Sequence, residues 1–219
     1  LFNLVAAVES AVNDRVVEFD RAGQVRQFIA AVGDQPLRDP IGLAVDPQGR
    51  LWIADQGSRR VLVRAMDGSL AKVLTLPKND SEKTPDPTDV AITPDGKAAW
   101  VVDNENHRLV RFDIATDAMI LAGGYGESLG QLHHPFMVAI GPRDDVFVSD
   151  VINGRVSVFT AQGKPVSPIG SYGIERGQTY RPKGIACDAA GRTWVADSLL
   201  GVVQAFAAAL HVPRENVVS

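Results

Sequence analysis

Residues 40–56 read PIGLAVDPQGRLWIADQ: a short apolar run, a turn with proline and glycine, a second apolar run and a closing aspartate. The same order recurs in residues 87–104 (PTDVAITPDGKAAWVVDN), 135–151 (PFMVAIGPRDDVFVSDV) and 182–198 (PKGIACDAAGRTWVADS). The opening prolines, and likewise the closing aspartates, lie 47 or 48 residues apart. A period of roughly 40–50 residues is typical of the blades of a β-propeller.

Each of these units predicts four short strands. The first strand follows the proline and is apolar throughout, as expected for a strand that is buried on both faces. The first strands are expected at residues 42–46, 89–93, 137–141 and 184–188. The second strands are expected at 51–54, 99–102, 146–149 and 193–196, and the third near 61–64, 109–113, 156–160 and 202–206. A weaker fourth strand closes the unit, and no segment keeps the period of 3.6 that would predict a helix.

A second pattern follows the closing aspartate, with asparagine three residues later and arginine five residues later. The third and fourth units carry it in full, the second unit carries the arginine, and the last unit carries only the aspartate. A carboxylate at a strand end can accept backbone N–H bonds and pair with an arginine, so these residues are expected to hold the loops in place. The structural set is Asp55, Arg60, Asp103, Asn106, Arg108, Asp150, Asn153, Arg155 and Asp197.

Together, the two patterns resemble the NHL repeat family over about residues 5–206. The resemblance implies an all-β fold: a β-propeller of about five four-stranded NHL-type blades in one domain, residues 1–219. The units are expected at about 1–34, 35–82, 83–130, 131–177 and 178–219. The first unit lacks its opening strand, and the last lacks the asparagine and arginine. The alternatives are therefore a five-bladed closure, an open array, or part of a six-bladed arrangement that closes against a partner.

Composition narrows the class of protein. The chain has 219 residues and a net charge of −4, which gives no long-range attraction to nucleic acid or to an anionic membrane surface. The single cysteine, Cys187, excludes an internal disulfide and is expected to be an inert thiol in an inner strand. No apolar run approaches the roughly 18–20 residues of a membrane-spanning helix.

Candidate binding residues are those that differ between units at the strand ends, because the repeat itself does not dictate them. Propellers bind ligands with loops at the ends of the central channel, although sequence drift on solvated loops would leave the same pattern. The candidates at the channel mouth are Arg38, Ile41, Thr88, Asp89, Glu105, His134, Phe136, Tyr180 and Lys183.

Catalysis has less support in the sequence. The resemblance implies that amidating lyases of this type hold zinc with histidines just after the opening proline, where this chain has Ile41, Thr88, Phe136 and Lys183. Neighbouring side chains on an extended strand point to opposite sides, so His133 and His134 are not expected to act together. A calcium-dependent lactonase site would have only Asp89 and Glu105 as carboxylate ligands. No metal and no cofactor are predicted.

The sequence therefore favours a non-catalytic propeller that presents loops to a protein or other extracellular partner, or to a second copy of itself through the incomplete edge. The alternatives are a metal-dependent enzyme, similar to an amidating lyase or a lactonase, and an RNA-binding NHL domain. The stretch that begins at Tyr180 resembles bacterial NHL-repeat proteins, which are often exported. That resemblance slightly favours a secreted or periplasmic location.

Overall fold

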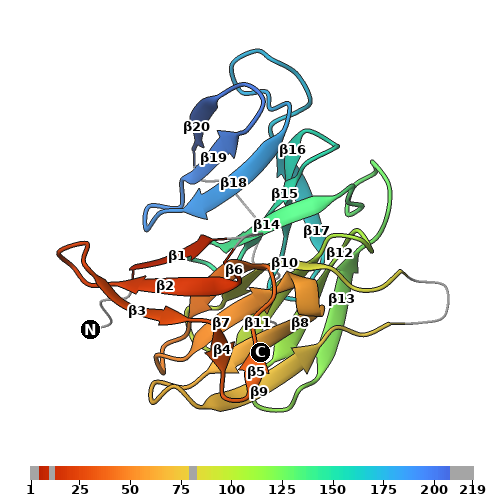
Figure 1. Cartoon of the computed structure of the whole chain (residues 1–219). Coiled ribbons are helices and arrows are strands. Elements are labelled where there is room, and N and C mark those ends of the chain that lie inside the picture. The colour runs from red at the N-terminus through yellow and green to blue at the C-terminus, as the bar shows by residue number, and fades with distance from the viewer. Residues whose placement is uncertain (1–4, 10–12, 79–82, 208–219) are drawn as a thin grey trace.

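The computed structural model describes residues 5–9, 13–78 and 83–207, and its regular structure is β-strand apart from one 3₁₀ turn, η1 (Gln56–Ser58). The strands form five antiparallel sheets that follow one another around a common centre (Figure 1). A separate two-stranded ribbon, β4 (Ala31–Val32) and β5 (Gln35–Pro36), joins the first sheet to the second. This arrangement confirms the predicted all-β propeller.

Three of the sheets have four strands each, in chain order from the inside outwards. The second sheet consists of β6 (Pro40–Val45), β7 (Leu51–Asp55), β8 (Arg60–Arg64) and β9 (Leu70–Thr75). The third consists of β10 (Pro87–Ile92), β11 (Ala98–Asp103), β12 (Arg108–Asp113) and β13 (Met119–Gly123). The fourth consists of β14 (Pro135–Ile140), β15 (Val146–Asp150), β16 (Arg155–Phe159) and β17 (Pro165–Ile169).

The first and last sheets have three strands each. The first consists of β1 (Val5–Glu9), β2 (Arg15–Phe19) and β3 (Val25–Ile29), and the last of β18 (Pro182–Cys187), β19 (Thr193–Asp197) and β20 (Val202–Phe206). In the complete sheets, the second strand contacts the innermost strand of the next sheet: β7 contacts β10, and β11 contacts β14. Strand β1 contacts β6 in the same way, so β1 has the place of a second strand. Among the residues that the structure describes, the first sheet therefore has no opening strand, as predicted. The segment 217–218, considered as a closing strand for the last unit, lies outside the described residues.

The hydrophobic core lies between consecutive sheets. Trp52 packs with Val101 and Phe112 of the third sheet, and Trp100 packs with Val138 and Val148 of the fourth. Burial of such large side chains is the main stabilising contribution in a fold of this kind. Each complete sheet is thus held by the sheet that follows it along the chain.

The closing aspartates fasten the loops of their own sheets. One carboxylate oxygen accepts a backbone N–H from the segment that leads into the first strand, 17 residues earlier. The bonds run from Arg38 to Asp55 (2.6 Å), from Asp86 to Asp103 (2.9 Å) and from His133 to Asp150 (2.7 Å). The other oxygen accepts the Nε–H of the arginine five residues on, at 2.9–3.0 Å: Arg60, Arg108 and Arg155. Asn106 and Asn153 also donate to these carboxylates, at 3.0 and 2.8 Å.

In the last sheet, the closing aspartate holds the loops without an arginine. Val202 occupies the arginine position, and Asp197 accepts four backbone N–H bonds, from Tyr180, Arg181, Leu199 and Leu200. Burial acts to raise the pKa of Asp197, but these backbone bonds outweigh it and lower the pKa. Gln204 takes over the contact with the preceding loop through Gly177 and Gln178.

Candidate functional site

Two loops of each sheet meet at one end of the strands. The Gly57 N–H donates to the Arg38 carbonyl at 2.9 Å, which joins the turn after the closing aspartate to the segment before the opening proline. The same bond recurs between Asn104 and Asp86, Ile152 and His133, and Ser198 and Arg181, at 2.9–3.1 Å. We call this end the loop face; it comprises residues 38–39, 56–59, 83–86, 104–107, 133–134, 151–154, 180–181 and 198–201.

One position of the loop face requires left-handed backbone. The residue directly before the third strand of each unit has φ between 42° and 66° in all five sheets: Asp14, Arg59, His107, Gly154 and Gly201. Glycine adopts this conformation without strain, whereas a residue with a Cβ adopts it at a higher conformational energy. The fourth and last sheets use glycine, so an arginine or a histidine at this position contributes something other than the turn.

These side chains link each sheet to the next. Asp14 Oδ1 accepts the N–H of Asp39 at 2.8 Å, and His107 Nδ1 accepts the N–H of His134 at 3.0 Å. Both acceptors therefore bind the residue that precedes the next opening proline. At the equivalent place Arg59 Nη1 pairs with the carboxylate of Asp86 at 3.1 Å.

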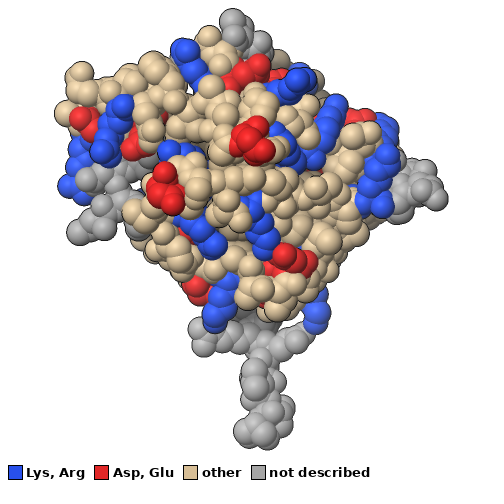
Figure 2. All heavy atoms as spheres, turned by 60° about the horizontal axis from the view of Figure 1, so that its bottom comes forward, with Lys and Arg blue, Asp and Glu red and all other residues tan. Residues whose placement is uncertain are grey.

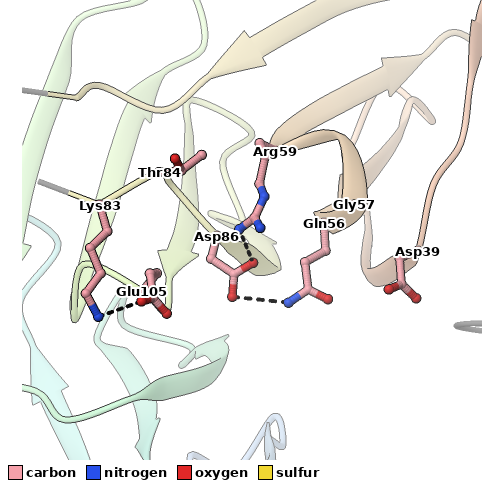
Figure 3. A pocket seen from close by; sticks show the side chains of 8 residues that line it. All are labelled: Asp39, Gln56, Gly57, Arg59, Lys83, Thr84, Asp86 and Glu105. Carbon is pink, nitrogen blue, oxygen red and sulfur yellow. Dashed lines mark hydrogen bonds and ion pairs between the residues drawn. The ribbon is translucent and has the colours of Figure 1, made fainter.

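A polar cleft of about 620 Å³ opens between the second and third sheets on the loop face. Its lining residues, shown in Figure 3, are Asp39, Gln56, Gly57, Arg59, Lys83, Thr84, Asp86 and Glu105. Asp86 lies in the middle and accepts bonds from both Arg59 and Gln56, each at 3.1 Å. Lys83 Nζ pairs with Glu105 at 2.6 Å on the side of the third sheet.

Two of the three acidic groups of the cleft, Asp86 and Glu105, have opposite pKa shifts. Burial raises the pKa of Asp86, although Gln56 and Arg59 act against it. The hydrogen bond from Lys83 lowers the pKa of Glu105. The cleft therefore offers hydrogen-bond donors and acceptors as well as positive and negative charges. It suits a polar ligand better than an apolar one.

Beside the cleft lies a cluster of four rings that we call the histidine cluster: His107, His133, His134 and Tyr125. The ring centroids are 4.6 Å apart for His107 and His134, 5.5 Å for His133 and His134, and 5.6 Å for His107 and His133. Tyr125 lies 5.0 Å from His107 and 4.9 Å from His133. All three histidines are half-buried, and Tyr125 is exposed.

The expectation that His133 and His134 point to opposite sides is wrong. Their rings stack with an angle of 26° between the planes. His134 has a φ of 52°, so the chain is not extended there and the alternation of a strand does not apply.

Hydrogen bonds fix the tautomers of two of these imidazoles. Asn104 Nδ2 donates to the Pro135 carbonyl at 2.6 Å, so its Oδ1 faces His134 Nδ1 at 3.0 Å. His134 Nδ1 must therefore carry the proton, and Nε2 keeps a lone pair while the ring is neutral. His107 accepts with Nδ1 and so carries its proton on Nε2. Burial, followed by the charges of His134 and His133, lowers the pKa of His107.

Within the described residues, no three histidine, cysteine, aspartate or glutamate side chains are arranged to hold a metal ion. The imidazoles of the cluster pack ring against ring and do not converge on one point. Among the helices described, none is long and apolar enough to cross a membrane.

Two of the channel-mouth candidates, Thr88 and Asp89, are buried between inner strands and do not present their side chains to solvent. Thr88 Oγ1 donates to the Phe136 carbonyl at 2.7 Å, and Asp89 Oδ2 accepts the Val138 N–H at 2.9 Å. Burial raises the pKa of Asp89 to about 7. On its other side, a Cβ at Gly42 would lie 2.5 Å from Asp89, which leaves room only for glycine.

The structure distributes the remaining candidates over several places. Glu105 lines the cleft, and His134 belongs to the histidine cluster. The Lys183 ammonium lies 5.0 Å from the centroid of the Phe136 ring, and Tyr180 packs against Tyr172 with centroids 4.8 Å apart. The other two are Arg38, which is exposed, and Ile41, which is half-buried on β6.

Sequence reasoning missed several residues of the cleft and the histidine cluster: Arg59, Lys83, Asp86, His107 and Tyr125. A signal was available, because Arg59 and His107 align with Gly154 and Gly201 when the units are placed in register.

Charges of both signs are mixed on one face of the molecule. Lysine and arginine are interspersed with aspartate and glutamate over the face seen in Figure 2. Arg60 and Arg108 pair with Asp55 and Asp103 at 2.9 and 3.0 Å.

The fold is a β-propeller, and two of its stretches match a known repeat. The family model described as NHL repeat matches residues 37–63 and 84–112, which confirms the repeat predicted from the sequence. Peptidylglycine alpha-amidating monooxygenase from Rattus norvegicus is 29% identical over 136 residues, which are 57% of this chain and 14% of that protein. The mouse protein matches to the same extent.

Solved structures with the same fold differ in function. A virginiamycin B lyase from Staphylococcus aureus has a TM-score of 0.61 at 16% identity, over 91% of this chain and 64% of the lyase chain. An auxiliary nutrient binding protein from Bacteroides thetaiotaomicron has a TM-score of 0.68 at 16% identity, over 93% and 56%. A gluconolactonase from Xanthomonas campestris has 0.66 at 20%, over 90% and 66%. At such identities the likeness concerns the fold, and this chain spans less than two thirds of each.

Proposed function

We propose that this chain is a non-catalytic binding propeller whose loop face, centred on the polar cleft, binds a hydrophilic segment of a protein partner. The observation that carries the proposal is the choice of residue at the left-handed position. Arg59 and His107 occupy backbone that glycine would adopt without strain, and Arg59 lines the cleft.

The ion pairs of the cleft suit exchange with a partner. Arg59 and Lys83 expose 49% and 63% of their side chains, so each pair is worth only about 0.2–1 kcal/mol. A partner that supplies its own carboxylates and amides can replace these bonds at little cost. The frame behind them is fixed by the buried closing aspartates Asp55 and Asp103. The partners of Arg59 and Lys83 can thus be exchanged for groups of a bound protein, while the loops that carry these two side chains stay in place. Charged groups held at fixed positions are what electrostatic specificity requires.

Site-specific photo-crosslinking tests this proposal. A photoreactive residue in place of Thr84, inside the cleft, is expected to crosslink a discrete partner from the source organism, whereas one at Gln162, in the β16–β17 turn, is not. Arg59→Gly, which takes the residue found in the fourth and last sheets, should abolish the crosslink while the circular dichroism spectrum shows an intact β-sheet fold. Arg26→Ala on β3 is the matched control. Equal crosslinking by the Arg59→Gly variant would refute the proposal.

A metal-dependent enzyme is the second candidate. It is favoured by the similarity to proteins named as a lyase, a gluconolactonase and an amidating monooxygenase. Elemental analysis of protein purified without a metal-affinity tag separates the two candidates. One equivalent of zinc or calcium per chain, lost on substitution of His134, would favour the enzyme.

Self-association through the incomplete sheets is a further form of the binding proposal. The outer strand β20 has no fourth strand beside it in the described part of the chain. An unpaired edge of this kind is a site for adding a strand from another molecule. Light scattering that gives the mass of a single chain would count against it. A secreted or periplasmic location remains part of the proposal and rests on the resemblance alone.

A further inference from the structure

The end of the third strand distinguishes the second sheet from the other four. Four residues after the residue that pairs with the last residue of the preceding strand, the second sheet has Arg64. The other sheets have phenylalanine there: Phe19, Phe112, Phe159 and Phe206. The last three belong to the same core clusters as an aromatic side chain of the preceding sheet, which is Trp52, Trp100 or Phe147. An arginine at this position therefore interrupts the packing that the repeat provides elsewhere.

The tryptophan of this aromatic pair is also replaced between the first and second sheets. Trp52 and Trp100 lie three residues before the end of their strands, and the strand register puts Ala6 at the same position of β1. Alanine and arginine thus occur at the two positions that hold tryptophan and phenylalanine at the next junctions. Between these same two sheets a cleft of about 300 Å³ is present.

Apolar side chains form much of this cleft. Ile29 of β3 and Leu51 of β7 line it and are each 4% exposed, so the cleft reaches the core between the two sheets. Val45 and Met66 also line it, and they expose 37% and 67% of their surface. A ligand with an apolar chain would remove part of this surface from water, which favours binding.

Two of the three charged side chains that line the cleft are paired with each other. Glu18 accepts hydrogen bonds from Arg26 Nη1 at 3.3 Å and from Gln27 Nε2. The Arg26 side chain is 59% exposed, so its ion pair with Glu18 contributes little to stability, but the two charges offset each other. The net charge that remains in the cleft is the guanidinium of Arg64.

Arg64 is half-buried, and its N–H groups are available to a ligand. Among the residues that the structure describes, none accepts a hydrogen bond from Arg64. The carboxylate of Asp67, in the turn that follows, accepts the N–H and the hydroxyl of Ser69 at 2.9 and 2.7 Å. The guanidinium lies against Gly68, where an added Cβ would be 3.0 Å from Nη2, so this turn limits its position. A guanidinium can bind a carboxylate with two parallel N–H···O bonds.

We infer that this cleft binds a small organic carboxylate with an apolar chain. The carboxylate pairs with Arg64, and the chain packs on Ile29 and Leu51. A volume of about 300 Å³ lies at the lower end of the range for small-molecule sites. The turns 46–50 and 65–69 place the cleft at the end of the strands opposite the loop face. The inference therefore does not depend on the function proposed above.

Hexanoate is a suitable probe, because it combines a carboxylate with a short apolar chain. Titrated into the ¹⁵N-labelled chain at pH 7, it should shift the Nε–H signal of Arg64 and the amide signal of Leu51 in NMR spectra, with saturation. Butanoate and acetate should bind more weakly, by up to about fourfold for each methylene that no longer packs in the cleft. Hexylamine has the same chain and the opposite charge, so it should leave the Arg64 signal in place. An Arg64 signal that does not move with hexanoate up to about 10 mM would overturn the inference, and so would equal affinities for acetate and hexanoate.

Variants separate the charge of Arg64 from the fold. Arg64→Met keeps an unbranched side chain but removes the guanidinium, so hexanoate should bind at least about tenfold more weakly while the circular dichroism spectrum stays unchanged. Arg64→Phe takes the residue of the other four sheets and should abolish binding by occupying the cleft as well. Arg21→Ala is the matched control, since it removes a positive charge from the exposed turn between β2 and β3, outside the cleft, and should change the affinity less than about twofold. Hexanoate binding by Arg64→Met at the affinity of the wild type would refute the site.

Discussion

The third and last sheets share the opening proline, two apolar runs and a closing aspartate, but they differ in burial. All six residues of β11 are buried, whereas β19 alternates between buried and exposed residues. Trp100 is fully buried, and its counterpart Trp194 exposes 39% of its surface. The sequence pattern within a unit determines where its strands form and how they pair. Whether both faces of a sheet are buried depends on the sheet that follows it along the chain. The fourth sheet covers Trp100, whereas no described sheet follows the last one to cover Trp194.

The tryptophan pair tests this contrast most strongly. Trp100→Ala should reduce the free energy of unfolding by about 3–5 kcal/mol, because it leaves a cavity between the third and fourth sheets. Trp194→Ala should cost about 1 kcal/mol, since it loses partial burial and the indole bond to Asp188 at 3.1 Å. Denaturant titration of both variants measures the difference. Equal losses would show that the outer face of the last sheet is covered in solution.

The buried ion pair gives the next largest effect. Arg108 and Asp103 expose 6% and 0% of their side chains, so Arg108→Gln leaves a buried carboxylate without its cation. The expected loss is about 3 kcal/mol. Val202→Gln at the same position of the last sheet is the matched control and should change stability by less than about 0.5 kcal/mol, because Asp197 is already held by backbone N–H groups. A loss below about 1 kcal/mol for Arg108→Gln would mean that the loop contacts of Arg108 are unimportant.

A third test uses pH, because the third sheet has a titratable group where the last sheet has Gly184. Burial raises the pKa of Asp89 to about 7 in the folded chain, against about 3.9 unfolded. Between these values the folded state binds more protons than the unfolded state, so stability falls as the pH rises from about 4 to about 7. Above pH 7 the loss is complete.

Asp89→Asn should remove that loss. The amide still accepts the Val138 N–H but leaves a buried NH₂ beside Gly42, so the expected net gain at pH 8 is on the order of 2 kcal/mol. The gain should disappear as the pH falls towards about 3, where Asp89 is protonated in both states. Melting curves of wild type and variant across this range provide the measurement. A difference independent of pH would show that Asp89 is not the group that titrates.

Periodic features of this chain could be predicted from sequence, and local deviations could not. The recurrence of proline and aspartate every 47 or 48 residues was sufficient for the sheets and for the missing opening strand of the first unit. The histidine cluster was missed because its geometry depends on left-handed backbone at His107 and His134, which no strand pattern encodes. The cleft was missed because it combines loops that are 19–66 residues apart, such as those of Asp39, Asp86 and Glu105, and only the packing of two sheets brings them together.

The smallest expected change in stability comes from introducing into the last sheet the arginine that it lacks five residues after Asp197. Val202 is 43% exposed at the position that Arg108 occupies in the third sheet. Val202→Arg would place a guanidinium beside Asp197, whose pKa is already lowered by backbone bonds, so the new pair should add no more than about 0.5–1 kcal/mol. Because the pair would be exposed, the gain should disappear in 1 M salt, whereas the contribution of the buried Arg108 pair should persist. Thermal melts of the variant at low and high salt measure this. A larger, salt-resistant gain would mean that the missing arginine, rather than the missing neighbour, makes the last sheet differ from the third.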